Sequence, residues 1–282
     1  MSDPPDTETI RTFLRSRDPD HYLTALFAPR HARIALTALY AFNAELARIP
    51  DLVSEPTLGE IRLQWWRDAV GTLESGGVTG NPLADALGQA MQSHALPKPL
   101  LQGIIDARSA DLEGGGFEDL QALKAYFYKT EGALFALSAR ILGGSDAQTG
   151  RTANSAGVAY GLARRLCAIP QDAAEGRVML PLTVLNENAL EPEQLLAGKG
   201  EPQVRQVIEA LAGEARDALA LARAGLSEMD PLLRPAFAPL GLVAPYLAVL
   251  SRVSHNPLHD IAGINPLYRF LALWRAGRRG PA

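Results

Sequence analysis

Hydrophobic residues recur at three- and four-residue intervals along most of the chain, the spacing that gathers them on one face of a helix. HARIALTALYAFNAELA (31–47) shows this spacing, and GEIRLQWWRDAVGTLES (59–75) alternates an apolar stripe with charges. QVRQVIEALAGEARDALALARAGL (203–226) is amphipathic in the same way. The one segment that favours an extended backbone is short, GRVMLPL (176–182). The pattern therefore predicts an all-α protein.

The order of these segments predicts one domain. FEDLQALKAYFYKTEGALFALSARILGG (117–144) has the pattern of a long helix, and TANSAGVAYGLARRLCAI (152–169) is small and apolar almost all round, as a central helix would be. The connections are short, so about ten helices should pack as a single domain over residues 1–282. We expect residues 1–18 and 276–282 to be mobile ends.

Composition narrows the range of possible functions and cellular locations. A formal net charge of −4 argues against broad nucleic-acid binding. The only cysteine, Cys167, allows no intrachain disulfide, and the acidic start MSDPPDTETI has no apolar core typical of a secretory signal. The longest apolar run, Ala236 to Leu250, is interrupted by prolines and too short to cross a bilayer. We expect a cytoplasmic protein, with peripheral contact to the inner membrane left open.

Candidate chemistry lies in two similar segments. Each follows a helix rich in small and apolar residues, and each carries an aspartate just after an Ile-Pro pair: Asp51 in the first and Asp172 in the second. If the two helices face each other, carboxylates on either side of a cavity could bind a diphosphate through Mg²⁺, which prefers oxygen ligands. Three arginines near the second segment could bind the anion directly or pair with Glu131 or Asp172, and we favour pairing. These are Arg164, Arg165 and Arg177.

The residues around both segments resemble the squalene/phytoene synthase family. The resemblance rests on YAF (40–42), LQWWRDAV (63–70), AYFYKTEGALFALSARILG (125–143) and GRVMLP (176–181), and it covers roughly Tyr22 to Trp274. It implies an all-α isoprenoid synthase fold with a central cavity. In active members each acidic segment carries an Asp-x-x-x-Asp pair that binds diphosphate through Mg²⁺.

Both pairs have lost their first aspartate in this chain. The family pattern places these aspartates at positions 47 and 168, which are Ala47 and Ala168, while Asp51 and Asp172 remain. One protein carboxylate holds Mg²⁺ weakly, and Arg48 adds a repulsive positive charge. Pro50 and Pro170 should kink or stop the two helices. Asp51 and Glu55 should not form a replacement pair, because the residue before Pro56 is disfavoured in helical geometry.

A branch of the family shares this degeneration. The chain is similar to the assembly factors of respiratory complex I in AFNAEL (41–46), VSEPTLGEIRLQWWRDAV (53–70), LCAIPQD (166–172) and NPLYRFLALWRAG (265–277). The resemblance implies a non-catalytic protein whose partner is a complex I subunit or assembly intermediate. It implies no catalytic residues, no metal ligands and no cofactor. Asp51, Asp172 and the three arginines would form a remnant diphosphate site.

Two alternatives stay open. The first is a Mg²⁺-dependent head-to-head prenyltransferase, and the second is a protein that binds a prenyl or other lipid in the cavity. For a binding protein, the candidate surfaces are the helix with Trp65 and Trp66 and the aromatic, basic segment from Tyr268 to Arg279. Of the adjacent tryptophans, we expect one in the core and one on the surface. His255 and His259 have a zinc-like spacing but no evident third ligand.

Overall fold

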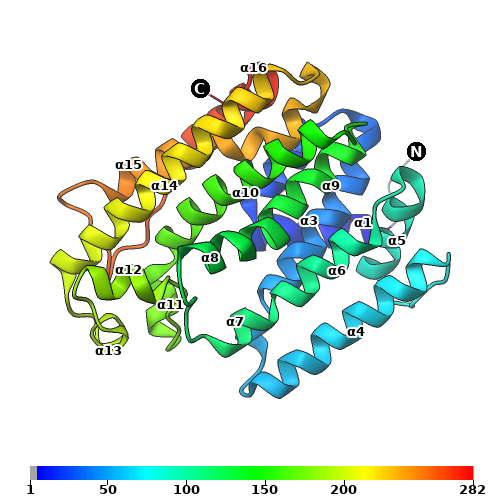
Figure 1. Cartoon of the computed structure of the whole chain (residues 1–282). Helices are drawn as coiled ribbons and strands as arrows, with labels where there is room; N and C mark the ends of the chain where they lie inside the picture. Colours follow the sequence, from blue (N-terminus) through cyan, green and yellow to red (C-terminus); the bar gives the residue numbers. More distant parts are fainter. Residues whose placement is uncertain (1–4, 282) are drawn as a thin grey trace.

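The computed structural model describes residues 5–281, which form sixteen α-helices and four short 3₁₀ or π segments (Figure 1). The α-helices are α1 (Pro5–Arg17), α2 (Pro19–Phe27), α3 (Arg33–Ala47), α4 (Pro56–Glu74), α5 (Pro82–His94), α6 (Lys98–Ala107), α7 (Ser109–Glu113), α8 (Leu120–Phe127), α9 (Ala133–Ile141), α10 (Ala147–Cys167), α11 (Ile169–Ala174), α12 (Leu182–Glu187), α13 (Pro192–Leu196), α14 (Glu201–Ser227), α15 (Val243–Leu250) and α16 (Pro266–Arg279). The 3₁₀ segments are η1 (Arg30–Ala32), η2 (Pro50–Leu52) and η4 (Pro231–Leu242), and η3 (Tyr128–Gly132) is a π-helical turn.

The prediction of about ten helices was too low, because several expected helices are divided. The expected helix over 117–144 consists of α8, η3 and α9, since a π turn interrupts its hydrogen bonding. Most of the two predicted ends lies in helices α1 and α16, with Asp18, Gly280 and Pro281 just beyond them; residues 1–4 and 282 lie outside the described residues. Their mobility stays a prediction.

The segment predicted to be extended, residues 176–182, is extended only in its middle, because Gly176 has a φ of 73° and Leu182 begins α12. The Val178 amide donates to the Gly114 carbonyl at 2.9 Å, and the Leu182 amide donates to the Phe117 carbonyl at 2.8 Å. A single bridge joins Phe117 to Pro181, and within residues 5–281 there is no β-strand. This pairing holds the chain after the second acidic segment against the loop between α7 and α8.

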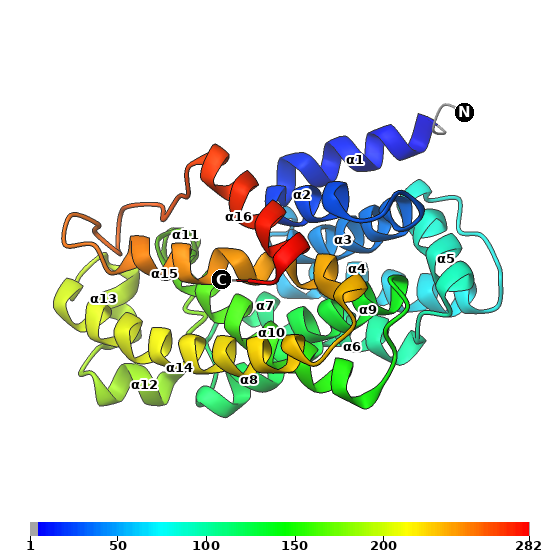
Figure 2. The ribbon, with the colours of Figure 1, turned by 90° about the horizontal axis from the view of Figure 1, so that it is seen from above.

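Helix α10 is the central helix that the sequence predicted. It packs against α14, α9, α15 and η3, and it runs through the middle of the bundle between α14 and α3 (Figures 1 and 2). Gly157 permits the approach to η3, because a Cβ there would lie 2.3 Å from the Gly132 nitrogen. The buried apolar side chains of α10 form one cluster with those of α14 and α15, and most of the buried apolar side chains of α3 to α6 belong to a second cluster.

One described segment, Pro231–Leu250, is long and apolar enough to cross a membrane by length and composition alone. It comprises η4 and α15, and 56% of its most apolar window is buried inside the fold. Phe237, Leu242 and Val243 have no exposed surface. This segment therefore belongs to the core, as the two prolines suggested.

Candidate functional site

Both acidic segments lie at the ends of helices, as the prolines predicted. Helix α3 ends at Ala47 and α10 ends at Cys167, and Pro50 and Pro170 lie in the first turns of η2 and α11. A proline is tolerated there because the first amides of a helix have no partner within it. Glu55 is extended, with φ −136° and ψ 137°, so it does not share a helix face with Asp51.

A cavity of about 340 Å³ opens between these helix ends. Its lining includes Ala47 and Ala168, the two positions that lack an acid, and also Asp51; Asp172 lies just beyond the lining, next to Gln171. The other lining residues are mostly polar or charged: Arg17, Asp18, His21, Asn43, Ala44, Arg48, Arg108, Tyr126, Phe127, Glu131, Tyr160, Gly161, Arg164, Arg165 and Gln171. The cavity therefore has the position expected from the sequence and a strongly polar wall.

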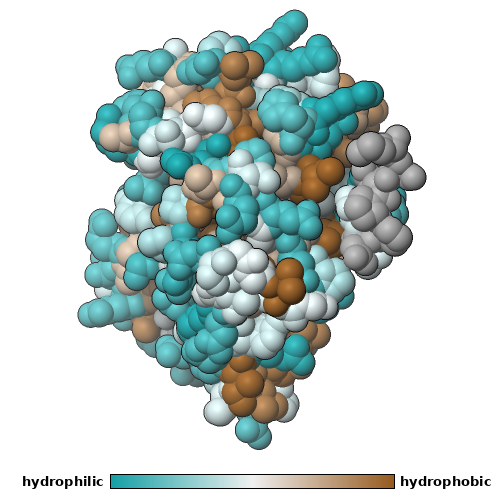
Figure 3. All heavy atoms as spheres, turned by 90° about the vertical axis from the view of Figure 1, so that its right-hand side faces the viewer, coloured by the Kyte–Doolittle hydropathy of each residue, from teal (hydrophilic) through white to brown (hydrophobic). Residues whose placement is uncertain are grey.

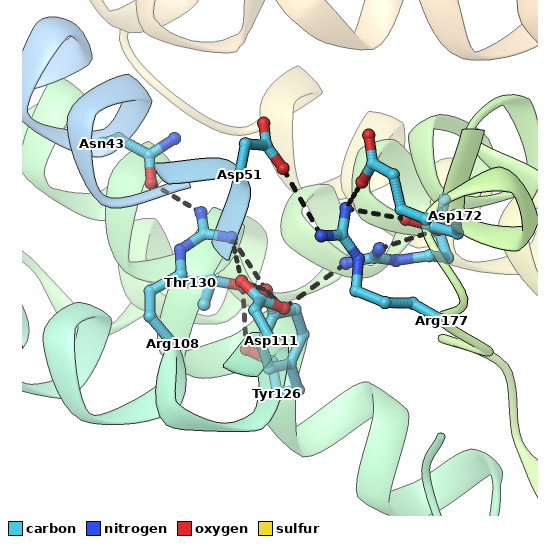
Figure 4. A network of polar contacts seen from close by, with 10 residues as sticks. Asn43, Asp51, Arg108, Asp111, Tyr126, Thr130, Asp172 and Arg177 are labelled. Carbon is cyan, nitrogen blue, oxygen red and sulfur yellow. Dashed lines mark hydrogen bonds and ion pairs between the residues drawn. The ribbon is translucent and has the colours of Figure 1, made fainter. Parts of the chain in front are cut away.

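Arg177 joins the two remaining aspartates. Its guanidinium lies 3.4 Å from the Asp51 carboxylate and 3.6 Å from that of Asp172, and it also contacts Glu175 (Figure 4). The extended segment that follows α11 carries Arg177 to this place, beside the end of η2. The predicted pairing of Arg177 is confirmed. Its positive charge lies between the two carboxylates that a bridging cation would need.

Asp172 is bound on its other side by Arg165. Arg165 Nη1 lies 3.2 Å from one Asp172 oxygen, and Arg177 binds the other oxygen. The residue is 7% exposed, and burial raises the pKa of its carboxyl above the ordinary value although both arginines favour the charged form. A metal ion could use this carboxylate only by displacing a guanidinium group from a nearly buried site.

A further set of buried polar residues, which the sequence did not suggest, lies beside the same wall of the cavity. Arg108 donates to Asp111 at 3.0 Å, to the Tyr126 hydroxyl at 2.8 Å and to the Asn43 side chain at 2.9 Å. Asp111 also lies 3.7 Å from Arg165, which connects these residues to the second acidic segment (Figure 4). Burial raises the pKa of Tyr126 well above its ordinary value, so its hydroxyl stays a proton donor to Asp111.

Arg164 pairs with an acid that the sequence did not suggest. Asp20, on α2, has no exposed surface and lies 3.4 Å from Arg164 and 2.9 Å from Arg269. It also accepts hydrogen bonds from the hydroxyls of Tyr160 at 3.0 Å and Tyr246 at 2.7 Å. The expectation that Arg164 would pair with Glu131 or Asp172 was wrong, because α2 brings Asp20 to α10.

A charged pair lies at the inner wall of the cavity. His21 Nδ1 is 2.7 Å from the Asp18 carboxylate. Burial lowers the pKa of His21, but the charge and hydrogen bond of Asp18 outweigh burial and raise the pKa above 6.5. Burial likewise would raise the pKa of Asp18, yet His21 holds it far below its ordinary value. The nearby Glu131 on η3 has one buried carboxylate oxygen without a hydrogen-bond partner.

Two tryptophans and two histidines are the remaining candidate residues. Trp66 is buried and Trp65 is exposed, as expected for neighbours on a helix. His255 is buried near Asp260 and His259 is exposed. Across residues 5–281, no three His, Cys, Asp or Glu side chains are grouped so that they could hold a metal ion.

The family model of squalene/phytoene synthase matches residues 14–265, which is most of the chain. The chain belongs to the squalene/phytoene synthase family. The resemblance found in the sequence is thereby confirmed. A solved dehydrosqualene synthase, in complex with a ligand, superposes with a TM-score of 0.80 at 19% identity and covers 96% of this chain and 95% of its own. That likeness confirms the all-α isoprenoid synthase fold.

Two kinds of family member resemble the chain in sequence. NADH dehydrogenase (ubiquinone) complex I, assembly factor 6 of Mus musculus is 32% identical over 266 residues, covering 93% of this chain and 80% of the relative. Phytoene synthase of Thermus thermophilus is 29% identical over 237 residues, covering 81% of this chain and 76% of the enzyme. The chain is thus similar in sequence both to an assembly factor and to a synthase.

Proposed function

We propose that this family member assists the assembly of respiratory complex I by binding a subunit or assembly intermediate, and that it does not condense prenyl diphosphates. The observation that carries the proposal is the state of the acidic segments. Ala47 and Ala168 supply no ligand, and the carboxylates of Asp51 and Asp172 are paired with Arg177. A protein that keeps the fold while its metal ligands are missing or paired is better suited to binding than to Mg²⁺ chemistry.

The face of α4 is the surface that we assign to the protein partner. Leu58, Ile61 and Trp65 are exposed and share one side of the helix, since they are spaced by three and four residues. Trp65 packs edge-on against the buried Trp66, with ring centroids 5.0 Å apart, so its position is fixed before any partner arrives. Figure 3 shows hydrophobic surface at the lower tip of the molecule, where α4 begins in Figure 1. Exposed tryptophan on a rigid support is typical of binding hot spots.

Deletion of the gene tests the proposal. We expect the amount of assembled complex I to fall while squalene and phytoene products stay unchanged, and we expect the wild-type chain to restore the complex. Rescue by Asp51→Ala is also expected, because that carboxylate is not needed as a metal ligand. A loss of isoprenoid products with normal complex I would instead identify a synthase.

Substitutions on α4 test the partner surface. Ile61→Glu should abolish rescue, because it places an unpaired charge in the centre of the apolar face. Leu221→Glu is the matched control, since Leu221 is equally exposed but lies on α14. Both variants should melt within a few degrees of the wild type. Rescue by Ile61→Glu would exclude α4 as the contact.

The polar cavity favours a second role, the binding of an anionic ligand without metal. Five arginines line it, against three acids, and a prenyl or lipid ligand would be held there by its anionic group. Pyrophosphate titrated into the chain in the presence of EDTA should bind, and Arg17→Gln should weaken that binding about tenfold, because Arg17 lines the cavity whereas Arg48 is already paired with Glu45. Binding that requires Mg²⁺ would favour the synthase alternative instead.

A further inference from the structure

Helix α16 is firmly attached on one side. Arg269 lies 2.9 Å from the fully buried Asp20, and Leu273 has no exposed surface. Gly241 of η4 allows α16 to approach closely, because a Cβ there would lie 2.8 Å from the Ala276 Cβ. The helix is therefore a fixed part of the fold, although the family match ends at residue 265, just before it begins.

The opposite side of α16 is apolar and uncovered. Leu267, Leu271 and Trp274 are 67%, 50% and 39% exposed, and their spacing of four and three residues places them on one stripe. Figure 2 shows α16 at an outer edge of the bundle, beside α2 and with one long side free. Exposed apolar residues that form a continuous stripe on a rigid helix mark a contact surface.

The net charge around this stripe is opposite in sign to the net charge of the rest of the chain. Residues 261–282 contain four arginines and no acid, so they carry +4; because the whole chain carries −4, the residues before them carry −8. Arg269 is paired with Asp20, whereas Arg275, Arg278 and Arg279 are exposed. None of these three forms an ion pair with an acid among the described residues. Three guanidinium groups that are free of acidic partners thus lie at the end of the apolar stripe.

Trp274 and Arg278 are the residues where the apolar and basic parts meet. The Arg278 guanidinium lies over the Trp274 ring, 5.0 Å from its centroid. A tryptophan next to an arginine suits the boundary between acyl chains and phosphate head groups, because the ring is amphipathic and the arginine can bind a phosphate. An apolar helix face with basic residues at its edge is the pattern of a helix that lies in a membrane surface.

We infer that α16 docks this protein on an anionic phospholipid membrane, with Leu267, Leu271 and Trp274 inserted at the surface and the three free arginines on lipid phosphates. The net charge of −8 before residue 261 favours this orientation, since an anionic surface repels net negative charge. The contact is peripheral, because the apolar stripe is one helix face and no described segment leaves the core to cross the bilayer.

Vesicle flotation of the full chain tests this inference independently of complex I. The chain should float with equimolar phosphatidylglycerol and phosphatidylcholine, should not float with phosphatidylcholine alone, and should be released by high salt. Replacing Arg275, Arg278 and Arg279 by glutamine should lower partitioning about a hundredfold, at roughly fivefold for each charge. The matched control replaces Arg151, Lys199 and Arg216, which are exposed on other elements.

The apolar stripe has its own test. Leu271→Asn should lower partitioning about tenfold, whereas Leu221→Asn on α14 should have no effect. Thermal melts of all variants check that the fold is kept. Equal flotation of wild type and triple glutamine variant would overturn the inference. So would failure of the wild type to bind anionic vesicles, and if the triple variant then also failed to rescue complex I, the stripe would be a protein contact.

Discussion

Asp51 and Asp172 follow the same Ile-Pro pair at the ends of α3 and α10, yet their carboxylates lie in different surroundings. Asp51 lies on the short η2 segment and its side chain is exposed. Among the described residues, its only ion pair is with Arg177. Asp172 is 7% exposed and is bound by both Arg165 and Arg177. The difference comes from the chain after each motif, because only the second segment continues into a helix that packs inward. Similar motifs therefore place their aspartates in unequal surroundings, one at the surface and one nearly buried.

The largest effect expected from this comparison is on stability. Asp172→Ala should lower the free energy of unfolding by about 3 kcal/mol, because it removes a nearly buried carboxylate that binds two guanidinium groups. The loss is limited because Arg165 keeps Asp111 and Arg177 keeps Asp51 and Glu175. Asp51→Ala should cost about 1 kcal/mol or less, as exposed ion pairs do. Urea unfolding of the two variants measures the difference. Equal losses would show that the two carboxylates have equivalent surroundings.

A smaller effect concerns pH and the Asp18–His21 pair. Because folding raises the pKa of His21 above 6.5, its contribution is complete below that value and is lost as the pH rises through the folded pKa. Asp18 has a lowered pKa, so its contribution is complete above 3.8 and is lost only as the pH falls through the folded value. His21→Asn should lower the free energy of unfolding by about 2 kcal/mol and flatten the decline of stability above pH 6.5. His94→Asn, at a histidine whose pKa burial lowers, should leave that decline intact.

The smallest effect is expected from restoring the missing acids. Ala47→Asp with Ala168→Asp places two carboxylates beside the cavity, where they could raise Mg²⁺ affinity slightly. Arg177 would still pair with Asp51 and Asp172, and the helices would still end before Pro50 and Pro170. We expect no condensation product from this double variant. Product formation would mean that two aspartates alone separate this chain from an enzyme.

Most of the fold could be predicted because the helical period and the prolines act locally. The ends of α3 and α10, the exposed Trp65 and the central α10 all follow from residues close together in the sequence. The polar partners could not be predicted, since they connect distant segments. Arg108 reaches Asn43 across 65 residues, and Tyr246 reaches Asp20 across 226. Neither pair leaves a periodic or compositional signal, and only the packing of the helices brings its members together.

The measurement that tests the central claim most directly is a product assay with the purified chain. Farnesyl and geranylgeranyl diphosphate are supplied with excess Mg²⁺, and phytoene synthase of Thermus thermophilus serves as the positive control. The account predicts no presqualene diphosphate, squalene or phytoene above the control without protein, at any Mg²⁺ concentration. Formation of any of these products that rises with Mg²⁺ and is lost in Asp51→Ala would contradict it, because Asp51 would then be a working metal ligand despite its contact with Arg177.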